Sequence, residues 1–125
     1  MKAHFILFVA DQSASTEFYA KALGIAPSLN VHGMTEFEIG DAVLGLMPRA
    51  GAEKLLGPAG AISAEAANRS ETYLVVENAL VNHRRAIAAG AVEISAMSER
   101  DWGHTAAYSL DPDGHILAFA EPTNG

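Results

Sequence analysis

The first half of the chain alternates between apolar runs and one amphipathic segment, and this pattern predicts its elements. His4–Val9 is a continuous apolar run, which is typical of a strand buried on both faces. A helix is expected next, because Asp11 supplies a side-chain oxygen for an N-cap and Phe18 lies on an apolar face at helical spacing. Gly24 is suited to the left-handed C-cap that ends such a helix near Leu23.

Three strand-like stretches follow this helix. They cover residues 26–32, 35–39 and 43–47. Gly40-Asp41, between the last two, is a two-residue hairpin signal, since glycine tolerates the positive φ that such turns require. The first half therefore predicts the order β-α-β-β-β.

The second half begins with a strand-like run over residues 71–76. Asn78 is expected to cap a helix that continues through Ala89 and stops at Gly90. A further strand is expected over residues 92–97.

A hairpin is expected to close the second half, with strands over residues 105–110 and 115–121. Its turn is Asp111-Pro112-Asp113-Gly114, because proline presets one torsion, aspartate bonds its local backbone and glycine accepts positive φ. The second half therefore predicts the same order of elements as the first.

The segment between the halves, residues 48–69, differs in character. It is rich in alanine, glycine and proline and has one short helical piece at residues 53–56. A connection of this length either crosses between parts of the fold, or covers a site, or is a plain flexible linker.

The two halves match in the positions of their strands, helix caps and glycines, which indicates an internal repeat. Side chains alternate along a strand, so matching faces of the two first strands can be read from the sequence. These faces carry His4, Ile6 and Phe8 in the first half and Glu71, Tyr73 and Val75 in the second.

Composition removes several classes of function. The 125 residues suffice for one domain with a real core, since half of them are apolar. The formal charge of −7 disfavours nucleic acid and anionic membranes as partners, and the absence of cysteine excludes disulfides, thiolate catalysis and cysteine-bound metal. No signal peptide follows Met1 and no apolar run is long enough to span a bilayer, so a cytoplasmic location is expected.

Several short motifs, spread over essentially the whole chain, carry a resemblance to a known family. They are His4 seven residues before Asp11, Phe18-Tyr19, Leu23-Gly24, Trp102-Gly103 and Asp111-Pro112-Asp113-Gly114-His115. With these motifs the chain resembles the vicinal oxygen chelate superfamily, which includes glyoxalase I, extradiol dioxygenases, fosfomycin-resistance enzymes and bleomycin-resistance proteins.

The resemblance implies an α+β fold, in which two βαβββ modules form an incomplete eight-stranded barrel around a ligand cavity. The whole chain, residues 1–125, would be a single domain of this kind. Module one would cover about residues 1–48, the connection residues 49–70 and module two about residues 71–125.

In the metalloenzymes of that superfamily, metal ligands come from the first and last strands of each module. Carried over to this sequence, the four positions are His4, Gly45, Glu71 and Ala118. Gly45 and Ala118 have no ligand atoms, so they are expected to leave space where metal ligands would otherwise project. Two protein ligands are one fewer than a catalytic metal site usually has. We therefore expect no stably bound metal and no cofactor, with a divalent metal held by His4 and Glu71 as the alternative.

A largely apolar cavity is expected to hold the ligand, with His4 and Glu71 facing each other across its floor. Either residue can anchor a polar group there or act as a general base. His4 can instead be a metal ligand or be satisfied by a backbone carbonyl, and Glu71 can be a solvated residue at a strand start. The expected lining residues are His4, Ile6, Phe8, Gly45, Met47, Glu71, Tyr73, Trp102, His104, Tyr108 and Ala118.

The mouth of this cavity is expected at Arg100, Trp102 and His104, just before a strand. Trp102 either stacks on a planar or cationic ligand or closes the end of the core. Tyr73 and Tyr108 either donate hydroxyl groups into the cavity or pack with these groups at the surface.

Other aromatic and basic side chains are expected outside the site. His32 and His83 have no chemical partners nearby in the sequence and are expected at the surface. Phe18 and Tyr19 are expected to pack their helix onto the core.

The sequence predicts a small-molecule-binding protein, since bleomycin-resistance proteins show that this fold can function by sequestration alone. A metal-dependent glyoxalase-like lyase or dioxygenase is the alternative, and a protein that mainly pairs with another subunit is a third class. A homodimer is expected, because the apolar fraction is high and a βαβββ unit leaves strand edges that need cover.

Overall fold

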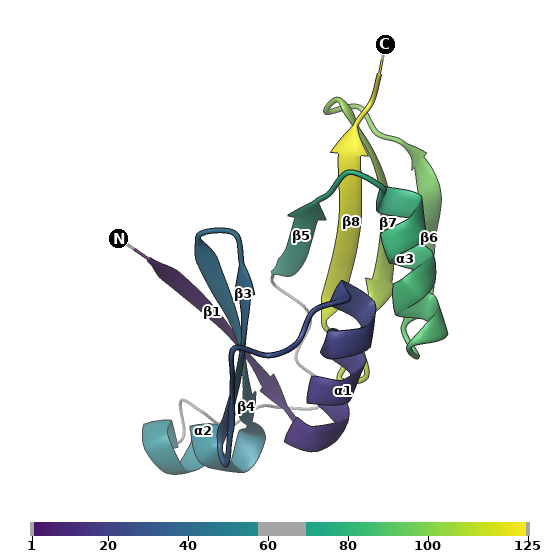
Figure 1. The fold of residues 1–125 in the computed structure, drawn as a ribbon. Coiled ribbons are helices and arrows are strands. Elements are labelled where there is room, and N and C mark those ends of the chain that lie inside the picture. Colours follow the sequence, from purple (N-terminus) through teal and green to yellow (C-terminus); the bar gives the residue numbers. More distant parts are fainter. Residues whose placement is uncertain (1, 58–69, 125) are drawn as a thin grey trace. The chain divides into compact units, whose positions relative to one another are not determined.

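A computed structural model describes residues 2–57 and 70–124, which form three helices and eight strands (Figure 1). The first half contains β1 (Ala3–Val9), α1 (Gln12–Leu23), β2 (Leu29–Val31), β3 (Met34–Ile39), β4 (Ala42–Pro48) and α2 (Arg49–Leu56). The second half contains β5 (Glu71–Val75), α3 (Ala79–Ala88), β6 (Val92–Glu99), β7 (His104–Leu110) and β8 (Ile116–Pro122). None of the helices in these two ranges has the length and apolar character needed to cross a membrane.

The chain divides into two compact units. The first contains β1 to β4, α2 and most of α1, and the second contains Lys21–Leu23, β5 to β8 and α3. Each unit has a four-stranded sheet, with strand order β1-β4-β3-β2 in the first and β5-β8-β7-β6 in the second. In both sheets the first strand pairs in parallel with the last strand of its module. The predicted α+β fold of two βαβββ modules is therefore confirmed.

Helix α1 has the predicted caps and packs on β3 in the first unit. The Asp11 side chain accepts a hydrogen bond from the backbone N–H of Ala14 at 3.0 Å, and Gly24 has φ of 69°. Tyr19 is fully buried, with its ring centroid 6.5 Å from that of Phe37 on β3. Phe18 is buried beside it, as expected for helix-packing residues.

The expected burial of β1 on both faces is wrong. His4, Phe5 and Ile6 are exposed, and Phe5 retains 63% of its surface. Strand β1 lies at the edge of its sheet, so its apolar run has fewer neighbours than a central strand. Burial is concentrated instead on the central strand β4, where residues 43–46 are all buried.

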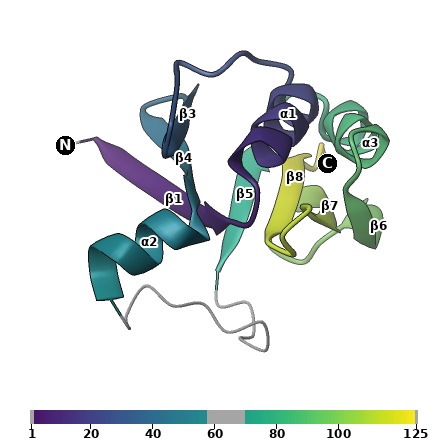
Figure 2. The ribbon, with the colours of Figure 1, turned by 90° about the horizontal axis from the view of Figure 1, so that it is seen from below.

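In the second unit, α3 covers one face of the sheet (Figure 2). The buried side of the helix carries Ala79, His83 and Ala86. The expected surface position of His83 is wrong, because this residue lies on the inner side and its Nε2 is 2.8 Å from Oε2 of Glu93 on β6. The adjacent Arg84 and Arg85 are exposed on the outer side of the helix, so their charges gave no information about the side on which His83 lies.

Several boundaries differ from the sequence expectation. Helix α2 starts at Arg49 and is longer than the piece expected at residues 53–56, whereas β2 keeps only Leu29–Val31 of residues 26–32. Asn78 lies at the start of α3, but its side chain makes no capping hydrogen bond. Its carbonyl instead accepts from the side-chain amide of Asn82 at 2.8 Å. Of the predicted connection, residues 58–69 lie outside the described part of the chain.

Candidate functional site

A polar aromatic network lies at one end of the second sheet. The indole Nε1–H of Trp102 donates a hydrogen bond to Oη of Tyr73 at 2.9 Å. The same oxygen is 2.7 Å from Nδ1 of His104, and the Tyr73 and His104 rings are stacked at 5.8 Å with an interplanar angle of 19°. Three of the residues predicted for the site are thus brought together.

Strand register places this network on the sheet face opposite α3. Tyr73 lies beside Ala118, which in turn lies beside Tyr108, so these side chains share one face. Glu93, the partner of His83 on α3, pairs with Ser109, which belongs to the other face. We call the face opposite α3 the aromatic face. Its residues on β5, β7 and β8 include Glu71, Tyr73, His104, Ala106, Tyr108, Ala118 and Ala120.

The loop between β6 and β7 positions Trp102. The backbone N–H of Arg100 donates to the carbonyl of His104 at 2.7 Å and closes this loop. Gly103 has φ of 89°, a value that side-chain-bearing residues rarely adopt. Trp102 is 53% exposed, so the interpretation in which it closes the end of the core is wrong, because about half of the residue's surface faces solvent.

Arg100 anchors the strand ends beside the network. Its guanidinium donates to the carbonyl oxygens of Ala96 and Ala106 at 2.9 and 2.8 Å, and to Oγ of Ser95 at 3.0 Å. The guanidinium carbon lies 5.3 Å from the centroid of the Tyr108 ring, within the range of a cation–π contact. Arg100 thereby adds a positive charge close to the aromatic face.

The charges around Tyr108 act on its hydroxyl group. Burial raises the pKa of Tyr108 above 10.0, and the carboxylate of Glu71 and the phenol of Tyr73 raise it further. The positive charge of Arg100 lowers the pKa of Tyr108, but by less than the other causes raise it. Tyr108 therefore stays protonated and available as a hydrogen-bond donor over the physiological range.

In the first unit, His4 has a partner that the sequence did not identify. Its Nδ1 is 3.6 Å from Oε2 of Glu36, which lies on β3. The two side chains reach each other across β4, where Gly45 pairs with Ile6 on one side and Glu36 on the other. The predicted hairpin at Gly40-Asp41 fixes how β3 and β4 are aligned. Together with the alternation of side chains along residues 35–39, it could have shown that Glu36 lies on the same face as His4.

The space expected above Gly45 is occupied. A Cβ added at Gly45 would lie 3.1 Å from Cγ1 of Ile6 and 3.3 Å from Sδ of Met34. The expectation that Gly45 leaves free volume in place of a metal ligand is therefore wrong, since neighbouring side chains lean over the glycine. Ile6, Phe8 and Met47 share this face of the first sheet with His4.

The donor atoms around His4 do not fit a resident catalytic metal. Among the residues that the structure describes, no third ligand atom lies close enough to His4 and Glu36 to give the three that such a site usually has. Ala118 and Gly45 offer no donor atom, and Glu71 belongs to the second unit. The pairing of His4 with Glu71 stays a prediction.

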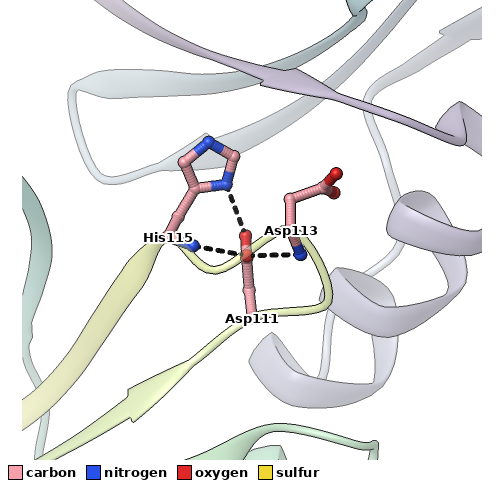
Figure 3. Close-up of side chains that lie close together, drawn as sticks. All are labelled: Asp111, Asp113 and His115. Atoms are coloured by element: carbon pink, nitrogen blue, oxygen red, sulfur yellow. Dashed lines mark hydrogen bonds and ion pairs between the residues drawn. The ribbon is translucent and has the colours of Figure 1, made fainter. Parts of the chain in front are cut away.

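One group of three possible metal ligands occurs within residues 2–57 and 70–124, and it lies in the turn between β7 and β8 (Figure 3). This group contains Asp111, Asp113 and His115. The buried Asp111 carboxylate accepts from the backbone N–H groups of Asp113 and His115 at 2.9 and 2.8 Å. Its second oxygen is 2.9 Å from Nδ1 of His115. These contacts hold the turn, so the arrangement has a structural explanation without an ion.

The sequence of the chain matches a known protein family along nearly its whole length. The sequence profile of the Glyoxalase/Bleomycin resistance protein/Dioxygenase superfamily matches residues 3–119. The chain belongs to this superfamily. The match covers both modules of the fold, so family membership applies to the whole described molecule. No curated protein matches the sequence.

Solved structures of this superfamily share the fold. A glyoxalase-related enzyme from Fulvimarina pelagi is similar over 95% of this chain and 86% of its own, with 23% identity and a TM-score of 0.84. A glyoxalase/bleomycin resistance protein/dioxygenase family enzyme from Burkholderia phytofirmans PsJN is similar over 97% of this chain and 98% of its own, with 19% identity and a TM-score of 0.86. At these identities the likeness concerns the fold and does not extend to activity.

Proposed function

We propose that this superfamily member binds a small organic molecule on the aromatic face and does so without a resident metal. The observation that carries the proposal is the Trp102–Tyr73–His104 network. An exposed indole held in place by a hydrogen bond from its own N–H offers a pre-ordered flat surface. Little conformational freedom is then lost when a planar ligand stacks on it.

The composition of the face supports this role. Ligand sites combine an apolar or aromatic lining with a few polar groups that fix orientation. Here three alanines, Ala106, Ala118 and Ala120, lie between the aromatic side chains and are fully buried beneath their larger neighbours. Polar groups are supplied by the hydroxyl of Tyr108 and the exposed carboxylate of Glu71. The face thus has the ingredients of a binding site.

Thermal melting with a panel of planar aromatic compounds tests the proposal. A compound that binds only the folded state raises the melting temperature, and the rise grows with the ratio of its concentration to its Kd. The shift should be lost in Trp102→Ala and kept in Leu55→Ala, which removes another exposed apolar side chain, from α2 in the first unit. A shift that survives Trp102→Ala unchanged would place the ligand elsewhere.

A metal-dependent lyase or dioxygenase is the second candidate, and the His4–Glu36 pair would supply two of the donors that it needs. An imidazole and a carboxylate on one face are donors that divalent transition metals accept. Metal content after dialysis separates the two candidates. Stoichiometric zinc, nickel, manganese or iron that disappears in both His4→Ala and Glu36→Gln would support the metalloenzyme and contradict the metal-free proposal.

A further inference from the structure

We infer that the Trp102–Tyr73–His104 network presents the Nε2–H group of His104 to the ligand, and that the site therefore selects planar molecules with a neutral carbonyl acceptor. The inference rests on the proposed function, since it concerns what the aromatic face recognises. It follows from the direction of the hydrogen bonds along the network.

The direction is set by Trp102. An indole nitrogen can only donate, so Oη of Tyr73 is the acceptor of the 2.9 Å bond. The Tyr73 hydroxyl still carries its own proton, and Nδ1 of His104 is the acceptor 2.7 Å away. If Nδ1 carried the proton instead, Tyr73 would accept twice and its hydroxyl proton would have no acceptor in the network.

The consequence is a defined tautomer of His104. A neutral imidazole that accepts at Nδ1 carries its proton on Nε2. Within residues 2–57 and 70–124, the His104 ring makes one side-chain hydrogen bond and one stacking contact, both with Tyr73. The Nε2–H group is therefore the end of the network that remains for a ligand, and each upstream donor polarises it further.

The charges on the face favour a neutral acceptor over an anion. Glu71 is exposed on the same face, and its negative charge is felt at Tyr108. The whole chain has a formal charge of −7. The positive charge of Arg100 is also near, but its guanidinium lies over Tyr108 and donates to Ser95, Ala96 and Ala106 within its own loop and strands. The net negative charge therefore disfavours a carboxylate ligand, whereas a ketone or amide carbonyl accepts the Nε2–H bond without adding charge.

Three probes of matched size test this selection. Acetophenone has a ring and a neutral carbonyl, ethylbenzene replaces the carbonyl by a methylene, and benzoate carries a charged acceptor. Trp102 is the single tryptophan, so its indole N–H gives one NMR signal that reports binding directly. Acetophenone should bind about five- to ten-fold more tightly than ethylbenzene, the difference that one hydrogen bond makes.

Variants assign that difference to His104. His104→Phe keeps a ring beside Tyr73 and removes both nitrogens, so acetophenone and ethylbenzene should bind it equally. His32→Phe is the matched control, because His32 is exposed and outside the face, and it should keep the wild-type preference. If His104→Phe loses its dispersed spectrum, Tyr73→Phe decides, since it removes the hydroxyl that sets the tautomer and should reduce the preference.

Each result has a distinct meaning. Equal binding of acetophenone and ethylbenzene to the wild-type protein, or an unchanged preference in the deciding variant, overturns the inference and leaves the proposed function standing. Tighter binding of benzoate overturns the choice of a neutral carbonyl. An indole signal that no probe moves overturns both the inference and the aromatic face as a binding site.

Discussion

At the scale of single residues, Gly45 determines what the face of the first sheet can hold. It lies on the central strand β4 between Ile6 and Glu36. Without a side chain at this position, Ile6 and Met34 close over the strand. The absence of a side chain at Gly45 is therefore what allows Ile6 and Met34 to fill the space above the strand.

A side chain at position 45 should therefore destabilise the protein. Gly45→Val is expected to lower the free energy of unfolding by about 1–3 kcal/mol, because its methyl groups overlap Ile6 and Met34. The loss should be smaller when Ile6→Ala is already present, since the double variant makes room. Urea unfolding of the four proteins in this cycle measures the coupling. Equal losses in both backgrounds would mean that Ile6 does not occupy the space.

Tyr108 makes a pH dependence predictable. Its raised pKa means that the folded state holds the phenol proton more tightly than the unfolded state. The resulting stability is fully present below about pH 10 and is lost as pH rises through the folded-state pKa. Tyr108→Phe should remove this part of the alkaline loss of stability.

The cause of the shift can be tested by titrating tyrosine ionisation in near-ultraviolet absorbance. Glu71→Gln should lower the pKa of Tyr108 and Arg100→Gln should raise it, in line with the signs of the two charges. Glu77→Gln is the control, because Glu77 is an exposed carboxylate that does not contribute to the shift. The same pKa in Glu71→Gln and the wild-type protein would refute the role of Glu71.

Candidate site residues could be predicted where a local sequence pattern placed them. They could not be predicted where their position depends on tertiary packing. Tyr73, Trp102 and His104 followed from strand alternation and from their place before a strand, and the structure brings them together. Glu36 was missed because its link to His4 depends on two strand registers. His83 was wrongly expected at the surface, because the two arginines that follow it suggested an exposed segment although His83 lies on the buried side of α3.

At the scale of elements, the turn between β7 and β8 is held by several hydrogen bonds of one buried carboxylate. The side chain of Asp111 is fully buried, and its carboxylate accepts hydrogen bonds from two backbone N–H groups of the turn. It also pairs with the imidazole of His115. The equivalent turn of the first module, Gly40-Asp41, has an exposed aspartate instead.

These two turns form a matched pair for mutagenesis. Asp111→Asn is expected to lower the free energy of unfolding by about 1.5–3 kcal/mol, because it replaces a charged acceptor of several hydrogen bonds. Asp41→Asn should change it by less than about 0.5 kcal/mol, since asparagine suits the same exposed turn. Chemical denaturation of both variants measures the difference. Similar losses would contradict a special role for the second turn.

The ends of helices and strands were predictable where nearby residues form a cap or a turn. The caps of α1, the hairpin at Gly40-Asp41 and the turn after β7 are set by residues within a few positions, and the structure confirms them. Strand β2 and helix α2 have weaker local signals, and their bounds differed from expectation. The exposure of β1 depends on its edge position, which only the order of strands in the sheet reveals.

At the scale of the whole molecule, we propose that the protein is a homodimer. Apolar side chains are exposed on edge strands, at Phe5 and Ile6 of β1 and at Val92 and Ile94 of β6. Edge strands with such side chains pair with other chains unless they are covered. Light scattering at micromolar concentration should give twice the chain mass of 13.1 kDa.

A charge on β1 should weaken that dimer. Phe5→Lys places a charge on an exposed apolar edge strand and should shift the protein toward the monomer mass, whereas His32→Lys, at an exposed position outside the sheets, should not. A wild-type protein with the mass of a single chain would refute the dimer. A dimer untouched by Phe5→Lys would exclude β1 from its interface.

The central claim is that ligands bind the aromatic face, and alanine-methyl NMR with acetophenone as the probe tests it most directly. Ala106 and Ala107 are neighbours on β7 whose side chains lie on opposite faces, so one pair of signals separates the two faces. The account predicts that the methyl signals of Ala106, Ala118 and Ala120 shift on titration, while those of Ala107 and of Ala86 on α3 stay in place. Shifts confined to Ala107 and Ala86, or no shift at Ala106, Ala118 and Ala120, would contradict it.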